Sequence, residues 1–107
     1  MAGKVKLIIY VPVSHTEAVL KALGDAGAGE IGNYSHCSFT TRGTGRFLGN
    51  EKSNPAIGQS GISEAVEEDR IEVTVFKSRL EQAVLAMKAV HPYEEIAFDI
   101  YPLEDIE

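Results

Sequence analysis

The chain has 107 residues, of which 44% are apolar and 24% are charged, and this composition is typical of one folded domain. Its formal net charge of −6 argues against nucleic acids and anionic membranes as partners, because both attract basic surfaces. A single cysteine, Cys37, excludes an intrachain disulfide and indicates a reducing compartment. We therefore expect one cytoplasmic domain over residues 1–107, with no nucleic acid and no membrane among its partners.

The first predicted strand covers residues 4–12 and is apolar on both faces. Leu7, Ile9 and Val11 alternate on one face, whereas Ile8 and Tyr10 make the other face apolar as well. Such a strand is central in its sheet, or its second face is covered by another subunit. We therefore expect a homo-oligomer.

The order of the remaining elements predicts the fold class. They are a helix over 15–26, a strand over about 34–41, a glycine-rich loop over about 43–63, a strand over 66–76, a helix over 79–90 and a strand over 95–101. A Ser-x-x-Glu capping box precedes each helix, Ser14 with Glu17 and Ser78 with Glu81, at equivalent positions 64 residues apart (78 − 14 and 81 − 17). The β-α-β-β-α-β order predicts an α+β ferredoxin-like sandwich, with two helices on one face of an antiparallel sheet.

Three side chains are candidate metal ligands. His36 and Cys37 fall on the predicted second strand, and His91 ends the second helix, close in sequence to Glu94 and Glu95. Imidazole, thiolate and carboxylate groups bind zinc or copper, so a divalent metal ion is a candidate cofactor if these segments meet. The alternative is structural: the histidine favours the negative end of a helix dipole, the glutamates are solvated and the cysteine is packed.

Gly43, Gly45 and Gly49 have a spacing close to that of a dinucleotide-binding loop. Three residues separate the second and third glycines where the fingerprint has two, and no helix pattern follows. Arg42 and Arg46 still offer guanidinium groups to a phosphate or carboxylate. The alternative, which the sequence favours, is a twisted hairpin whose glycines permit tight bends.

Several motifs, in order along the chain, resemble one known domain. They occupy residues 29–39 (GEIGNYSHCSF), 43–47 (GTGRF), 54–58 (NPAIG), 91–95 (HPYEE) and 99–101 (DIY). Over about residues 6–103 the chain resembles the domain inserted into bacterial members of the NGG-interacting-factor-three family, also described as GTP cyclohydrolase type 2-like. The resemblance implies a stand-alone version of that domain, with a PII/CutA-like fold and a trimeric assembly. The two-metal site of the family belongs to its flanking domain, so the resemblance carries over no hydrolase chemistry.

The same resemblance suggests a class of function. In PII-type relatives the long loop contacts partners and clefts between subunits bind small ligands, and CutA relatives are linked to divalent metal tolerance. We therefore expect a non-enzymatic, oligomeric binding or regulatory module, with a small molecule or a divalent metal ion at a subunit interface.

The residues expected to serve this function fall into two groups, and no residue is assigned a catalytic role. The ligand-binding group is Arg46, Asn54, Glu94 and Glu95, and the metal-binding group is His36, Cys37 and His91. Two alternatives stay open. One is an enzyme with an intersubunit site, in which Glu94 or Glu95 is a base and Arg46 holds an anion, and the other is a structural module that docks on a protein partner.

Overall fold

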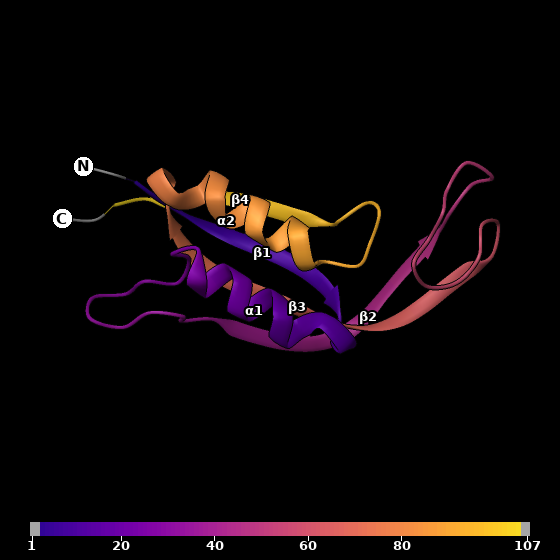
Figure 1. Cartoon of the computed structure of the whole chain (residues 1–107), viewed down its shortest axis with the longest axis horizontal. Coiled ribbons are helices and arrows are strands. Elements are labelled where there is room, and N and C mark those ends of the chain that lie inside the picture. The colour runs from indigo at the N-terminus through magenta and orange to yellow at the C-terminus, as the bar shows by residue number, and fades with distance from the viewer. Residues whose placement is uncertain (1–2, 106–107) are drawn as a thin grey trace.

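The computed structural model describes residues 3–105. Within them the elements are β1 (Lys4–Pro12), a 3-10 turn (Val13–His15), α1 (Thr16–Asp25), β2 (Phe39–Leu48), β3 (Ser63–Phe76), α2 (Lys77–Val90) and β4 (Phe98–Pro102). The strands form one antiparallel sheet in the order β2-β3-β1-β4, and both helices lie on the same face of it (Figure 1). The predicted ferredoxin-like α+β fold is confirmed. No helix in the described part of the chain is long and apolar enough to cross a membrane.

The hydrophobic core lies between the helices and the sheet. Alternate residues of a strand share one face, so every second residue of β1 and β3 points toward the helices. The buried apolar side chains that meet there include Val5, Leu7, Ile9 and Val11 of β1, Ile71, Val73 and Val75 of β3, Val19 and Leu23 of α1, and Ala83 and Met87 of α2. The core therefore occupies one side of the sheet, and the other side, which we call the open face, is not covered by either helix (Figure 1).

The open face is less apolar than the sequence suggested. Ile8 lies on this face between Glu72 of β3 and Asp99 of β4, and it is fully buried within the single chain. Its burial therefore requires no second subunit. Phe39 and Tyr101 lie on the same face by strand alternation and are 67% and 47% exposed. These two side chains are the ones that a second copy would cover.

The connection between β2 and β3 differs from the predicted loop over residues 43–63. β2 begins at Phe39 rather than near residue 34, and it continues to Leu48, so the loop is limited to residues 49–62. β2 pairs with β3 along its whole length, whereas β1 reaches β3 only as far as Glu68. The hairpin therefore continues beyond the sheet as a two-stranded arm, residues 44–67, which Figure 1 shows projecting from the body. β4 begins at Phe98, three residues later than predicted.

Neither predicted capping box forms. Val13–His15 makes a separate 3-10 turn, so α1 begins at Thr16, and Oγ of Ser14 bonds Nδ1 of His15 at 2.8 Å. α2 begins directly after β3, which places Ser78 inside its first turn, and no side chain caps this helix. The two Ser-x-x-Glu motifs mark the correct positions along the chain but not the mechanism by which the helices start.

Candidate functional site

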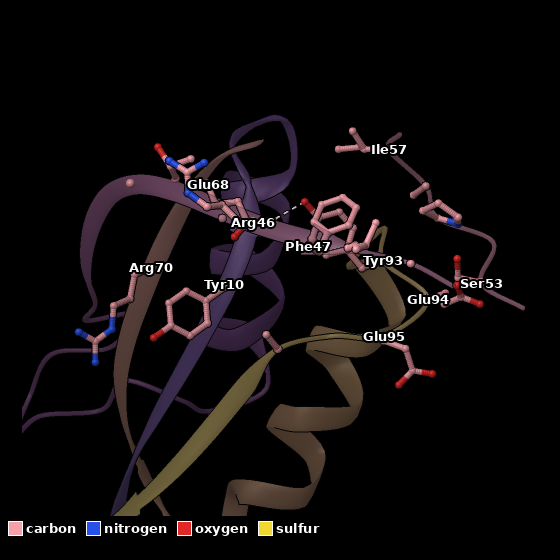
Figure 2. A pocket seen from close by; sticks show the side chains of 18 of the residues that line it. Tyr10, Arg46, Phe47, Ser53, Ile57, Glu68, Arg70, Tyr93, Glu94 and Glu95 are labelled. Atoms are coloured by element: carbon pink, nitrogen blue, oxygen red, sulfur yellow. Dashed lines mark hydrogen bonds between the residues drawn. The ribbon is translucent and has the colours of Figure 1, made fainter. Parts of the chain in front are cut away.

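A cavity of about 740 Å³ lies on the open face, where β1 ends and the arm begins (Figure 2). Tyr10, Arg70 and Thr41 form one row of its floor, because Tyr10 and Thr41 both pair with Arg70 across the sheet. The walls come from the arm and loop on one side and from the connection between α2 and β4, residues 91–97, on the other. Cavities of this volume typically accommodate small organic molecules.

Two glycines of β2 shape the space above the floor in different ways. Gly43 and Gly45 alternate with outward residues on the strand side that carries Thr41 and Phe47, and all four line the cavity. A Cβ added at Gly43 would have no atom within 4 Å, whereas a Cβ at Gly45 would collide with the carboxylate of Glu68. Glu68 thus lies across the backbone of Gly45, and the carboxylate fits there because residue 45 has no side chain.

Substitution of these two glycines should have different effects on stability. Gly45→Ala is expected to lower the free energy of unfolding by about 1–3 kcal/mol, because the new methyl group displaces the buried Glu68 carboxylate from its hydrogen-bond donor. Gly43→Ala is the matched control and is expected to stay within about 0.5 kcal/mol of the parent. Urea unfolding measures both values. Equal losses at the two positions would contradict the placement of Glu68.

Tyr93 connects the two walls of the cavity. Its hydroxyl donates to Oε2 of Glu68 at 2.7 Å, and its ring meets Phe47 of the arm edge-on, with the ring centroids 6.1 Å apart. Burial, and secondarily the bonded carboxylate, raises the pKa of the Tyr93 phenol. The phenol therefore remains a proton donor at neutral pH and holds Glu68 against the arm.

A second tie joins the loop to the same connection. The backbone N–H of Asn54 donates to Oε1 of Glu94 at 2.7 Å. Figure 2 shows Glu94 and Ser53 together at this side of the cavity, beyond the Phe47–Tyr93 pair. The rim is thus held by one backbone-to-carboxylate hydrogen bond between segments that are 40 residues apart.

His91 joins the 91–97 connection to the end of β1, and both of its ring nitrogens form hydrogen bonds. Nε2 donates to the carbonyl oxygen of Tyr10 at 2.8 Å, and Nδ1 accepts the backbone N–H of Tyr93 at 3.2 Å. This pattern assigns the neutral tautomer with the proton on Nε2. Burial lowers the pKa of His91, which outweighs the opposite effects of the Tyr10 carbonyl and of Glu68.

The lowered pKa of His91 predicts a loss of stability in mild acid. Below the ordinary value of 6.5 the unfolded chain binds a proton that the folded chain does not, so the free energy of unfolding falls as pH drops from 6.5 toward the folded pKa. His91→Gln keeps a side-chain donor but does not titrate, and it should flatten the profile between pH 7 and pH 5. Urea unfolding at these two pH values tests this, with His36→Gln as the control for an exposed histidine. An unchanged slope in His91→Gln would assign the pH dependence to another group.

The structure brings the predicted ligand-binding residues to one place. Arg46, Glu94 and Glu95 line the cavity, and the backbone of Asn54 holds Glu94 at the rim. Arg46 alternates with Gly45 and Phe47 along β2, so strand alternation places it on the other side of the strand from the row of Tyr10 and Arg70. That these residues bind a ligand remains a prediction.

The three predicted metal ligands are not brought together. His36 and Cys37 precede β2 in a loop rather than in a strand, and Nε2 of His36 lies 3.1 Å from Oδ1 of Asp25 at the end of α1. His91 lies at the other end of the sheet, against Tyr10 near the end of β1. Among residues 3–105 no group of three or more His, Cys, Asp or Glu side chains is placed to hold a metal ion.

Sequence reasoning did not identify Tyr10, Phe47, Glu68, Arg70 or Tyr93 as site residues. Tyr93 lies in the HPYEE motif, but its role depends on contacts with β2 and β3. The alternation Thr41-x-Gly43-x-Gly45-x-Phe47 was the one local signal available, because small residues on one strand face predict a hollow there.

The comparison with known proteins agrees with the fold and with the resemblance. No protein-family model matches the chain. The chain is 52% identical over 98 residues to a GTP cyclohydrolase 1 type 2 homolog of Halalkalibacterium halodurans and 52% identical over 100 residues to that of Bacillus subtilis. Each match covers 92% of this chain and 26% of the relative.

Solved structures show the same relation. A Bacillus cereus protein related to NIF3 matches with a TM-score of 0.81 and 47% identity, over 97% of this chain and 26% of that chain. The divalent cation tolerance protein CutA of Archaeoglobus fulgidus has a TM-score of 0.68 at 18% identity, covering 97% of this chain and 87% of its own. GlnK of B. subtilis, solved with ATP, has a TM-score of 0.65 at 19% identity, covering 96% and 84%. The last two likenesses concern the fold alone. By sequence and by fold, the chain therefore matches the PII/CutA-like segment of the GTP cyclohydrolase 1 type 2 homologs related to NIF3, and it spans about a quarter of their length.

Proposed function

We propose that this chain is a non-enzymatic binding or regulatory module that holds a small organic molecule in the open-face cavity. The observation that carries this proposal is the construction of the cavity. Gly43 leaves space above its floor, and Gly45 makes room for the Glu68 carboxylate. Its two walls are tied by the hydrogen bonds from Tyr93 to Glu68 and from Asn54 to Glu94. Gly43 leaves open a volume that a sheet packed for stability alone would fill with a side chain.

The arm is the element that would report occupancy. A ligand in the cavity touches the arm and the 91–97 connection together, so it adds to the few contacts that now join them. Binding would then fix the arm and loop 49–62 relative to the sheet, and a partner protein would recognise this ordered conformation. A ligand shifts the equilibrium between two conformations only if it makes better contacts with one of them. In this cavity those contacts would be made with the two walls, the arm and the 91–97 connection.

A homo-oligomer, with a trimer as the expected form, fits the exposed side chains of the open face. Phe39 and Tyr101 lie on the face that carries the cavity and are exposed in the single chain. A second copy covering them would place the cavity at a subunit interface. The single cysteine favours a cytoplasmic location for this assembly.

The described residues of a single chain are poorly suited to hold a divalent metal ion. The CutA neighbours are named for divalent cation tolerance, which makes a metal the natural alternative. Both nitrogens of His91 are already bonded, and those of His36 lie 3.0 Å from Oγ of Ser35 and 3.1 Å from Asp25. We therefore derive no function from a metal ion.

Native mass spectrometry of untagged protein, purified without chelator, tests the proposal. We expect a trimer that carries additional mass corresponding to an organic molecule, together with no hydrolysis of nucleotides or phosphate esters when divalent metals are added. A trimer that carries only metal mass, or metal-dependent hydrolysis, would contradict it. A clean trimer without added mass would favour a module that docks on a protein instead.

A further inference from the structure

Arg70, in the floor of the open-face cavity, has a guanidinium group that the protein itself does not fully use. Its Nε is buried and has no hydrogen-bond partner among residues 3–105. Its NH1 forms an ion pair with Oε2 of Glu72 at 3.7 Å, a distance too long for a hydrogen bond. Arg42, by contrast, donates from Nε to Asp69 at 2.6 Å. Buried donors are normally satisfied, so Arg70 lacks a hydrogen bond that a guanidinium group in a folded protein usually makes. Because Nε is buried, a ligand would reach this group through its terminal nitrogens.

The neighbours of Arg70 complete a site for a planar oxyanion. Tyr10 and Thr41 pair with Arg70 on the two adjacent strands, so a guanidinium group and two residues with hydroxyl groups share one face of the sheet, and all three line the cavity. A guanidinium group binds a carboxylate through two parallel hydrogen bonds, and hydroxyl groups supply further donors. Figure 2 shows Tyr10 and Arg70 together at one side of the cavity, with Phe47 and Tyr93 at the other.

The carboxylates around Arg70 favour a ligand with a single negative charge, with Arg46 as a second cation of the cavity lining. Glu68 and Glu72 precede and follow it by two positions on the same face of β3, and Glu94 and Glu95 stand on the wall. The charge of Arg42 is already matched by Asp69 and Glu67. These carboxylates would repel the several negative charges of a polyphosphate, whereas a single carboxylate needs only the guanidinium group of Arg70.

The rest of the lining is suited to an apolar ligand body. Phe47, Leu48, Pro55, Ile57 and Tyr93 line the part of the cavity formed by the arm, the loop and the connection. We infer that the open-face cavity binds a small monocarboxylic acid, with its carboxylate on Arg70 and its apolar or aromatic body against Phe47 and Tyr93. This inference rests on the proposed function, since it takes the cavity as the ligand site.

The test uses 2-naphthoate and decanoate as probes, with the matching amides and ATP for comparison. Each compound is titrated into the ¹⁵N-labelled chain, and the signals followed are the backbone amides of Gly43 and Gly45 and the side-chain Nε–H of Arg70. We expect at least one acid to shift all three signals with saturation. Its amide should bind at least about ten-fold more weakly, and ATP should bind more weakly still.

Variants separate the carboxylate contact from the cavity itself. Arg70→Gln is expected to weaken acid binding by about ten-fold, with Arg70→Lys in between because it keeps the charge but loses the fork. Arg79→Gln removes the same charge from α2, outside the cavity lining, and should bind like the parent. The comparison of acid with amide in the parent chain does not depend on whether a variant folds.

Each contrary outcome identifies what fails. Equal binding of acid and amide, unaffected by Arg70→Gln, would overturn the carboxylate assignment and leave the cavity as a ligand site. Tighter binding of ATP than of either acid would overturn the preference for one negative charge. If no probe moved the Gly43 and Gly45 signals, both this inference and the proposed ligand site would be wrong.

Discussion

Replacement of Leu23 by alanine is expected to lower the free energy of unfolding by about 2–5 kcal/mol. Leu23 is 1% exposed in the core between α1 and the sheet, so its truncation leaves a cavity that the close-packed strands β1 and β3 cannot fill. The same substitution at Leu85 of α2, which is 63% exposed, is the matched control and should change the value by less than about 0.5 kcal/mol. Both residues are in helices, so the difference in helix propensity cancels.

Urea unfolding of the two variants at two protein concentrations gives the measurement. A similar loss for both variants would contradict a core confined to the buried helix faces. A loss for Leu85→Ala that grows with protein concentration would instead place Leu85 in an interface between copies, because oligomer stability depends on concentration and monomer stability does not.

Stability and binding are assigned to opposite sides of one sheet. The side facing the helices carries Leu7, Ile9, Ile71 and Val73 in a closed core, whereas the open face carries a cavity whose floor contains two glycines. Gly43→Ala alters the cavity side alone and is predicted to be neutral for folding. If the cavity binds a ligand as proposed, most residues that contact the ligand lie apart from the apolar core that holds the domain together.

The sequence predicts the elements with local patterns most accurately. The bounds of β1 are as predicted because Leu7, Ile9 and Val11 alternate cleanly, and α2 differs from its predicted start by two residues. The glycine spacing favours a twisted hairpin, but the sequence does not predict how far β2 extends, because Gly43 and Gly45 have low strand propensity. Ten residue pairs with β3 override that propensity, and a Cβ at Gly45 would displace the carboxylate of Glu68 that lies over it.

The candidate site depends on contacts that no local pattern encodes. The row of Tyr10, Arg70 and Thr41 is set by the register between strands far apart in the chain. The hypothesis that His36 and His91 lie close together fails for a similar reason. α1 and α2 return from antiparallel strands, so their C-terminal ends lie at opposite ends of the sheet, with His36 at one and His91 at the other.

Replacement of Asp69 by alanine is the second substitution with a large expected effect, a loss of about 2–4 kcal/mol. Asp69 is 3% exposed and accepts hydrogen bonds from Nε of Arg42 at 2.6 Å and from Oγ1 of Thr16 at 2.7 Å. It therefore joins β2, β3 and the first residue of α1 at the point where the arm leaves the sheet. Alanine leaves the hydroxyl of Thr16 buried without this acceptor, whereas Arg42 is 56% exposed and regains water.

Asp69→Asn is the control that separates charge from shape. Asparagine keeps an acceptor for Thr16 but loses the ion pair with the partly exposed Arg42. Asp69→Asn should therefore lower the free energy of unfolding by about 1 kcal/mol less than Asp69→Ala does. Differential scanning calorimetry and urea unfolding measure the loss. Equal effects of the two substitutions would mean that the charge, and not the bond to Thr16, carries the stabilisation.

The pH dependence of the same variants gives an independent check. The bonds from Arg42 and Thr16 lower the pKa of Asp69 below its ordinary value of 3.8, so the folded chain resists protonation there more than the unfolded chain does. The stability that Asp69 contributes is complete above pH 3.8 and is lost as pH falls from that value through the folded pKa. Asp69→Asn should therefore lose less stability than the parent between pH 5 and pH 3. Profiles of equal slope would show that other carboxyl groups control the acid unfolding, and that the base of the arm is held by packing rather than by this carboxylate.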